Sequence, residues 1–347
     1  MKTIGISLWD GQVRAGGNAQ TVMRPAVHLE SRRRATSRDL FLETYAKFAG
    51  ACRSVEEPGL AIIAVDERTQ RAAGIVKLMA RVGRPVAAIA GRHDRCDLYL
   101  RGNDSLALRQ FAVVLGPVES WAASSTKVHY RVIDLRTSDG MFDEDGRMLR
   151  GLRAEGAAIL RSGGYTFFVL PLGDPSDWPE RADDAWQTLP ERVYFDEMEN
   201  CADGSHVRLT LPRDEIRQSR IFRTVGPRDT SPGHTGVIGT EHDLAGRLEI
   251  TGPRRQVTMN VGQDALRDGV LLGRYGRCDI SEAIEDPSLS RVHALLVHEQ
   301  DRLVIIDTAS YNGTRIVGEH RARLIELEHD LELQLGKQTR LRWRWLG

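Results

Sequence analysis

Short apolar runs separated by turns occur in two stretches of the chain. In the first stretch they cover residues 61–65, 86–90 and 166–170, and Gly163 and Gly164 precede the last run. Near the end of the chain, residues 340–345 alternate strictly between arginine and large apolar side chains. Apolar runs of this length predict buried β-strands, and strict alternation predicts a strand with one buried face. Both stretches are therefore expected to be all-β.

One segment has a different period. Between Arg38 and Val55, apolar and aromatic residues recur at helical intervals, which predicts one amphipathic helix. It closes a polar N-terminal segment, residues 1–57. The neighbouring β-rich stretch is a candidate partner for its apolar face, and the simplest interpretation is a surface helix with no partner outside the chain.

The two β-rich stretches repeat one another. Residues 91–98 read GRHDRCDL and residues 273–280 read GRYGRCDI. Matched positions differ by 182 over residues 91–114 and by 173 over residues 134–168, which predicts nine extra residues in the first copy, within 116–129. A length change confined to one turn indicates a duplicated domain.

We therefore expect an all-β chain with two domains, the first copy at 58–173 and the second at 246–347. The stretch between them, 174–245, begins with many acidic residues and prolines but few aliphatic ones. Such a composition predicts a linker that is partly disordered, because it cannot bury a core of its own.

Composition excludes several classes of protein. The 347 residues carry zero formal net charge and 41% apolar residues, which argues against general attraction to nucleic acid or to an anionic membrane. No apolar run is long enough to span a bilayer, and no secretory signal begins the chain. The four cysteines lie far apart, so we expect separate thiols in a reducing compartment, the cytoplasm.

Motifs for catalysis or cofactor binding are also missing from the sequence. No phosphate-binding glycine loop follows a predicted strand, no His/Cys cluster has zinc spacing, and no hydrolase or kinase signature appears. We expect a protein that is not an enzyme and holds no cofactor or metal.

The second copy carries three polar motifs in order: Gly273-Arg274, then Ser290-Arg291-Val292-His293, then Asn312-Gly313-Thr314. Together they resemble the forkhead-associated (FHA) domain, a β-sandwich that binds phosphothreonine peptides. The resemblance implies an eleven-stranded sandwich of two antiparallel sheets, with the ligand held by loops at one end. The predicted fold is then two FHA-like sandwiches joined by a long linker, after a short N-terminal helical segment.

The residue chemistry agrees with the resemblance. A phosphothreonine carries a charge of about −2 and three acceptor oxygens, which suit the planar donor fork of Arg274. Ser290 offers a hydroxyl donor, and Arg291 offers a second guanidinium. The resemblance implies that Arg274, Ser290 and Tyr311 contact phosphate and that Asn312 holds the peptide backbone. The family often has Thr or Ser where Tyr311 stands, so this contact departs from the pattern.

Three further residues are expected to support the loops. The resemblance gives architectural roles to Gly273 and His293, and Gly313 permits a tight turn after the asparagine. None of the three is expected to touch the ligand.

The first copy keeps the arginine, as Arg92, and loses the other ligands. In the predicted alignment Leu108 replaces the serine, Phe111 the histidine and Asp139 the asparagine. Acidic residues 143–145 add negative charge to the loop that a phosphate would approach. We expect the fold without phosphate binding, with a weak or altered phosphate site as the alternative.

These features predict a non-catalytic adaptor that reads the output of a Ser/Thr kinase in the cytoplasm. Its partner is expected to be a phosphothreonine-containing protein or a phosphorylated segment of this chain. Candidate phosphoacceptors are Thr36, Thr235 and Thr240, because family ligands are commonly selected at the third residue after the phosphothreonine. The simpler interpretation is that these are ordinary loop threonines.

Two other functions compete with this one. A phosphate-independent interaction scaffold in a larger assembly is the first alternative. Contact with nucleic acid through the arginine face of the last strand is the second, and the neutral net charge weighs against it.

Overall fold

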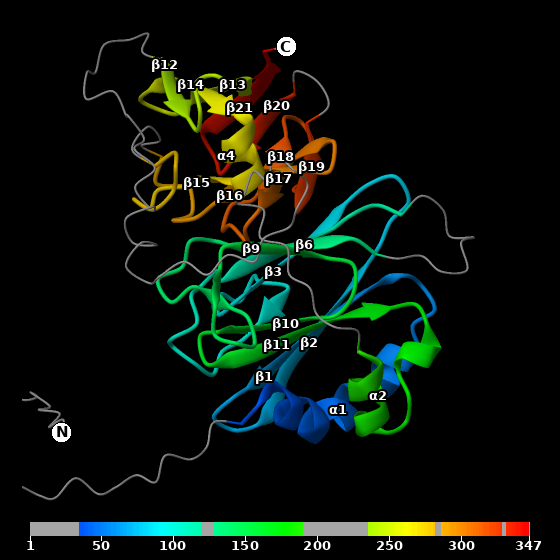
Figure 1. Cartoon of the computed structure of the whole chain (residues 1–347). Coiled ribbons are helices and arrows are strands. Elements are labelled where there is room, and N and C mark those ends of the chain that lie inside the picture. Colours follow the sequence, from blue (N-terminus) through cyan, green and yellow to red (C-terminus); the bar gives the residue numbers. More distant parts are fainter. Residues whose placement is uncertain (1–34, 119–127, 190–234, 282–285, 328–330, 347) are drawn as a thin grey trace, which may run out of the picture. The chain divides into compact units, whose positions relative to one another are not determined.

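The protein is described by a computed structural model, which places residues 35–118, 128–189, 235–281, 286–327 and 331–346. Strands dominate, and they form two β-sandwiches in succession along the chain (Figure 1). The predicted all-β class is confirmed. None of the described helices is long and apolar enough to cross a membrane.

The first domain consists of strands β1 to β11. Its larger sheet has the order β2-β1-β11-β10-β7-β8 and its smaller sheet the order β4-β3-β5-β6-β9, so it has the eleven strands that the resemblance implies. Neighbouring strands are antiparallel except β3 and β4. The strands are β1 (Gly59–Asp66), β2 (Arg71–Met79), β3 (Val86–Gly91), β4 (Leu98–Tyr99), β5 (Phe111–Leu115), β6 (Tyr130–Asp134), β7 (Met141–Phe142), β8 (Met148–Leu149), β9 (Gly151–Ala154), β10 (Ala158–Ser162) and β11 (Tyr165–Leu172).

The second domain repeats this plan with strands β12 to β21. Its sheets have the orders β12-β14-β13-β21-β20-β18 and β15-β16-β17-β19, ten strands among the described residues. The elements are β12 (Thr235–Ile238), β13 (Leu244–Thr251), β14 (Gln256–Gly262), α4 (Gln263–Asp268), β15 (Val270–Leu272), β16 (Ala294–Glu299), β17 (Arg302–Asp307), β18 (Thr314–Ile316), β19 (Leu324–Glu326), β20 (Glu332–Leu335) and β21 (Thr339–Trp345). Two features lie outside the prediction. Strand β12 precedes the expected start at residue 246 and pairs in parallel with β14, and a short helix, α4, precedes β15.

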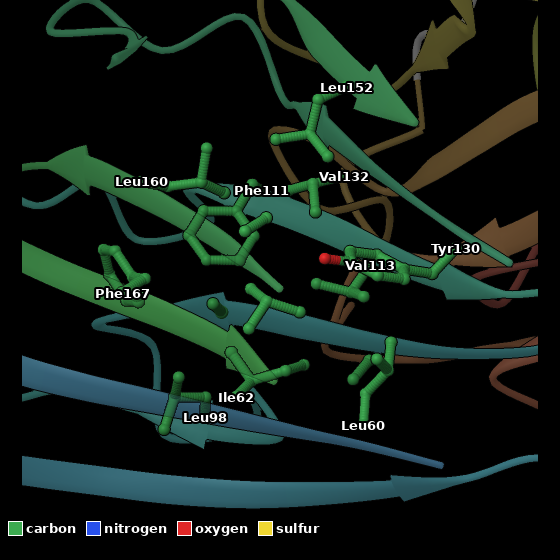
Figure 2. Packing of buried hydrophobic residues seen from close by; sticks show 14 of the residues in the cluster. Leu60, Ile62, Leu98, Phe111, Val113, Tyr130, Val132, Leu152, Leu160 and Phe167 are labelled. Carbon is green, nitrogen blue, oxygen red and sulfur yellow. The ribbon is translucent and has the colours of Figure 1, made fainter. Parts of the chain in front are cut away.

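Each domain encloses an apolar core between its two sheets. In the first domain, Ile62 and Phe167 from the larger sheet face Phe111 and Val113 from the smaller one (Figure 2). The Phe111 and Phe167 rings meet edge to face, with centroids 4.9 Å apart. In the second domain Trp343, in the alternating last strand, is fully buried. The predicted half-buried strand is confirmed there.

The predicted N-terminal helix is present as α1 (Ser37–Arg53) and packs on the first domain. Thr36 begins it with a capping box, in which the Thr36 hydroxyl accepts from the Asp39 N–H and the Asp39 carboxylate accepts from the Thr36 N–H. Its apolar face lies against the outer face of the β1–β11 pair, where Phe41 meets Phe168 edge to face at 5.4 Å.

The start of the predicted linker is folded onto this helix. A 3-10 turn, η1 (Pro175–Asp177), and helix α2 (Ala182–Thr188) follow β11, and α2 lies beside α1 (Figure 1). Trp178 is 3% exposed and packs between Tyr45 and Phe48. Large aromatic side chains from α1 therefore supply the core that the acidic segment cannot build alone.

The smaller sheets of the two domains share an apolar layer. Along β3, Ala88 and Ala90 lie in the core of the first domain, whereas Ile89 lies in a cluster that also holds Leu295 and Ile306 of the second domain. We call this cluster the shared layer. Its buried members are Ala87, Ile89, Cys96, Ala112, Val114, Ile133, Leu135, Leu271, Cys278, Val292, Leu295, Val297, Val304, Ile306 and Ala309. Strands covered on both faces need apolar residues at every position, which explains the unbroken apolar runs.

Polar contacts border the shared layer in a nearly symmetric way. In each domain an aspartate accepts a 2.8 Å hydrogen bond from the backbone of its own sheet, at Asp97 in the first domain and Asp279 in the second. Each aspartate also meets an arginine of the other domain. Arg323 lies 3.3 Å from Asp97, and Arg136 lies 2.5 Å from Asp279. The two copies thus contact each other through equivalent surfaces.

Candidate functional site

The turn after β15 positions Arg274. A Cβ on Gly273 would lie 2.3 Å from the Arg291 carbonyl oxygen, so only glycine fits where these two backbones meet. The Arg274 Nε donates to the Leu289 carbonyl oxygen at 2.6 Å. This bond fixes the guanidinium, and within the described residues Nη1 and Nη2 have no protein partner. The exposed Arg274 side chain therefore keeps its terminal donors for a ligand.

Ser290 lies beside this turn, in the loop that leads into β16. It is 8% exposed, and its hydroxyl accepts a 2.9 Å hydrogen bond from the Tyr311 N–H. Since the N–H occupies an acceptor position of the oxygen, the hydroxyl proton is available for donation elsewhere. The Arg274 N–H donates to the Ser290 carbonyl oxygen at 3.2 Å, which joins the two loops.

His293 supports both loops from below and is completely buried. Its Nδ1 accepts from the Ser290 N–H at 3.1 Å, so Nε2 carries the proton and donates to the Gly313 carbonyl oxygen at 3.3 Å. Burial lowers the pKa of His293 below its ordinary value of 6.5, although the nearby Asp307 carboxylate opposes this shift. The histidine is therefore a neutral structural residue, in the architectural place that the sequence gives it.

Asp307, at the end of β17, shapes the third loop. Its carboxylate accepts from the Ser310 N–H at 2.8 Å, from the Ser310 hydroxyl at 2.5 Å and from the Thr314 hydroxyl at 2.9 Å. The Gly313 N–H donates to the Ser310 oxygen, and Gly313 has a φ of 80°. This left-handed conformation favours glycine and explains the Asn-Gly pair.

Asn312 and Tyr311 lie at the tip of this loop. The Asn312 amide nitrogen donates to the Ser288 carbonyl oxygen at 2.7 Å, which ties the third loop to the second. The Tyr311 side chain is 65% exposed. Its backbone N–H bonds to Ser290, but within the described residues its ring hydroxyl has no protein partner.

The structure brings the predicted ligand residues together from three loops. Arg274 is bonded to the loop of Ser290, which in turn bonds to Tyr311, and Asn312 closes the group. Arg291 is exposed next to Ser290, and its backbone carbonyl accepts from the loop of Arg274 at 2.9 Å. The arrangement presents guanidinium and hydroxyl donors together, which suits an anion with several acceptor oxygens.

The first domain preserves the scaffold of this site. A Cβ on Gly91 would lie 2.5 Å from the Leu108 carbonyl oxygen, the same obstruction as at Gly273. The Arg92 Nε donates to the Leu106 carbonyl oxygen at 2.7 Å, as Arg274 does in its own loop.

Gln110 takes the place of the buried histidine. Its Oε1 accepts from the Ala107 N–H at 3.0 Å, and its Nε2 donates to the Gly140 carbonyl oxygen at 3.2 Å. These are the same two backbone groups that His293 joins in the second domain. A glutamine amide has one donor end and one acceptor end, so it can replace a neutral imidazole here.

This equivalence corrects the predicted alignment. Ala107, not Leu108, stands where the second domain has Ser290, and Gln110, not Phe111, stands where it has the histidine. The strand registers agree, because Ala90 pairs with Phe111 whereas Leu272 pairs with Ala294. Matched positions therefore differ by 183 from Ala107 through β5. The first domain has ten extra residues between β5 and β6, not nine. Alanine, like leucine, gives no side-chain donor, so the expected loss of the serine donor stands.

Not all of the acidic residues predicted near the first domain's loop are exposed. Asp139 is exposed at the asparagine position, but Asp143 is 2% exposed and accepts from the Arg147 N–H at 2.8 Å. Arg92 lies 3.8 Å from Asp104, in the adjacent loop.

Two candidate phosphoacceptors have local structural roles. The Thr36 hydroxyl caps α1 and lies 2.7 Å from Asp39, the acidic residue that marked it as a candidate. The Thr240 hydroxyl donates to the Asp264 carboxylate at 2.7 Å. Thr235 is the first residue of β12. Capping accounts for the spacing at Thr36, and the simpler interpretation of these threonines remains preferred.

Three cysteines are described, and all are free thiols: Cys52, Cys96 and Cys278. Burial raises the pKa of each to about 11, so they are unreactive as nucleophiles. Within the described residues no group of three or more His, Cys, Asp or Glu side chains is arranged to hold a metal ion.

Sequence reasoning missed the residues of the first domain that reach this site. Arg95 and Arg109 donate to backbone carbonyls between residues 308 and 311. No motif marks either arginine, and only the packing of the two domains brings them to the loop. The role of Gln110 is not visible in the sequence, because the second copy has one more residue between the Gly-Arg turn and this loop, and only the hydrogen bonds show the shift.

Comparison with known proteins agrees with the geometry. Residues 270–336 match the FHA domain family, so the chain contains an FHA domain in its second half. No curated protein matches the chain in sequence. Similar solved structures include the FHA-1 domain of Mycobacterium tuberculosis Rv1747, with 24% identity, 29% coverage of this chain, 97% of that chain and a TM-score of 0.24. The Synechocystis Slr1951 protein has 24% identity, coverages of 30% and 98% and a TM-score of 0.26.

Proposed function

We propose that the second domain binds phosphothreonine peptides and that the chain acts as a non-catalytic adaptor in Ser/Thr-kinase signalling in the cytoplasm. FHA domains are phosphothreonine-binding modules, and the match over residues 270–336 includes the loops of all the proposed ligands. The proposed phosphate ligands are Arg274, Ser290, Arg291 and Tyr311, and Asn312 is proposed to hold the peptide backbone.

One observation carries this proposal. Arg274 is held through Nε, which leaves two terminal donors, and the adjacent Ser290 hydroxyl has its acceptor side bonded to Tyr311. Preorganised donors with no acceptor in the described part of the chain favour a ligand with several acceptor oxygens, because the side chains need little further ordering. A phosphate ester has this chemistry, and a neutral peptide has only isolated carbonyl groups.

Titration of the full-length protein with phosphothreonine peptides, each beside its unphosphorylated form, tests the proposal. Calorimetry is expected to give one binding site per chain, specific for the phosphorylated form. The proposal is overturned if no peptide from a degenerate phosphothreonine library binds better than its unphosphorylated counterpart. Partner capture from cells that survives phosphatase treatment would instead favour the phosphate-independent scaffold.

A further inference from the structure

Arg109 of the first domain penetrates to the third loop of the second domain. Its Nε donates to the Thr308 carbonyl oxygen, and its Nη2 donates to the Ala309 carbonyl oxygen at 2.7 Å. The side chain is 5% exposed, and burial lowers its pKa. A buried charge is costly unless hydrogen bonds replace its hydration, so these two carbonyls are essential partners of the arginine.

Arg95 continues this contact to the tip of the loop. Its Nη1 lies 3.4 Å from the Ser310 carbonyl oxygen and donates to the Tyr311 carbonyl oxygen at 2.6 Å. The guanidinium also covers the Tyr311 ring, 4.5 Å from the centroid, a cation–π geometry. Four successive carbonyls, 308 to 311, therefore accept from two arginines of the first domain. Asn312 follows directly.

The loop contains a strained backbone position. Ala309 has a φ of 60°, a left-handed conformation that is unfavourable for alanine. Fixing the Thr308 and Ala309 carbonyls, which flank the Ala309 Cα, holds this conformation from outside the second domain. The Tyr311 N–H and the Asn312 side chain then point to Ser290 and Ser288 in the adjacent loop.

The contact of Arg109 has no counterpart in the other direction. By the corrected alignment, the residue of the second domain equivalent to Arg109 is Val292, which lies in the shared layer. Valine has no donor, so it cannot make an equivalent contact with the first domain's loop, residues 135–139. The domain without the complete ligand set supports the loop of the domain that has it.

We propose that the first domain is a positioning element of the phosphopeptide site, acting through Arg109 and Arg95. This inference rests on the proposed function of the second domain. Loss of the contact lets the 308–312 loop leave its competent conformation, and the apparent dissociation constant rises as the competent fraction falls. By linkage, bound phosphopeptide must strengthen the contact between the domains by the same factor.

The test uses the full chain with Arg109→Met, Arg95→Ala and a matched control, Arg131→Met. Arg131 is also a buried arginine of the first domain, 3% exposed, that donates to carbonyls of the second domain, His298 at 3.4 Å and Arg267. These carbonyls lie at the opposite end of β16 from the ligand loops. The control therefore removes a similar contact between the domains without touching the site.

We expect Arg109→Met to weaken phosphothreonine-peptide binding about tenfold, as for a competent fraction of about one tenth. Arg131→Met should bind as the wild type does, even where both variants unfold at similarly reduced temperatures. Arg95→Ala should have a smaller effect, and Arg109→Lys should recover part of the affinity because it retains a cationic donor. Faster amide exchange over residues 308–313 in Arg109→Met, and not in Arg131→Met, would place the effect in the loop.

Equal affinities for Arg109→Met and Arg131→Met, with Arg274→Ala still abolishing binding, would overturn the positioning role and leave the proposed function intact. Insensitivity to Arg274→Ala would overturn the proposed function itself. If Arg109→Met fails to fold, Arg95→Ala on the exposed rim gives the same comparison through a milder change, and wild-type affinity there would also count against the role.

Discussion

The first and second domains hold their loops with the same hydrogen bonds made by different side chains. Gln110 and His293 each accept from one loop and donate to another. Arg92 and Arg274 each donate Nε to a carbonyl of the adjacent loop. The scaffold of the site is therefore retained in both copies.

The copies differ where a ligand would bind. Ala107 occupies the position equivalent to Ser290, and Asp139 occupies the position equivalent to Asn312. In the second domain these two side chains also join neighbouring loops, and the first domain keeps the Gln110 and Arg92 bonds without them. Fold and ligand binding are thus separable in this architecture, and a copy can lose its ligand residues while its loops stay ordered.

The largest expected difference in peptide affinity is between variants of the two equivalent arginines, Arg274 and Arg92. Arg274→Ala should weaken phosphothreonine-peptide binding about a hundredfold or more, because it removes two charged hydrogen bonds of roughly 1.5–3 kcal/mol each. Arg92→Ala in the full chain should leave affinity unchanged. Calorimetric titration of both variants measures this difference, and a loss of affinity in Arg92→Ala would show that the first domain also takes part in binding the phosphate.

A smaller effect is expected at the serine position. Ser290→Ala should weaken binding by about tenfold or more, since it removes one hydrogen bond to a charged group. The reverse change, Ala107→Ser, should create no measurable phosphopeptide site in the first domain, because Asp139 still occupies the position of the asparagine. Titration of each variant gives both affinity and stoichiometry, and two bound peptides per Ala107→Ser chain would contradict this expectation.

The smallest expected effect is the pH dependence of folding stability that comes from the buried His293 ring. Burial lowers the pKa of His293, so the unfolded chain binds more protons between the folded pKa and 6.5. Stability is therefore fully present above pH 6.5 and falls as the pH decreases through that window. His293→Gln, which copies the side chain of the first domain, should fold and should reduce this acid-side loss.

Thermal unfolding midpoints of the wild type and His293→Gln, measured from pH 7.5 to 5, give this difference. His93 and His298 also have lowered pKa values and contribute equally to both proteins, so only the difference between the curves is informative. Parallel curves would show that His293 does not titrate differently in the folded and unfolded chains.

Much of the architecture follows from the sequence because it rests on repeated local patterns. Apolar runs predict the strands, helical spacing predicts α1, and the three polar motifs predict which loops converge. Gly273 and Gly313 are predictable because backbone contact and a left-handed turn require them. The site residues lie next to these glycines, so their approximate place follows as well.

The contacts between the domains could not be predicted in the same way. An apolar run such as 86–90 indicates that both faces of a strand are covered, but it does not identify the part of the chain that covers each face. Arg109 looks like an ordinary polar residue at the start of a strand, and its role depends on a loop 199 residues later. The equivalence of Gln110 and His293 could not be predicted either, because the hydrogen bonds of the two side chains define it and their residue types differ.

The shared layer determines which fragments of the chain can be prepared without exposing apolar surface. A fragment that retains only the second domain, strands β12 to β21, would uncover the outer face of β15, β16 and β17. Leu271, Leu295, Val304 and Ile306 would then face water as one apolar patch. Such patches promote self-association, so aggregation of a short fragment would reflect a lost neighbour rather than an unstable binding module. Boundaries that keep both sandwiches together, from α1 to β21, avoid this exposure.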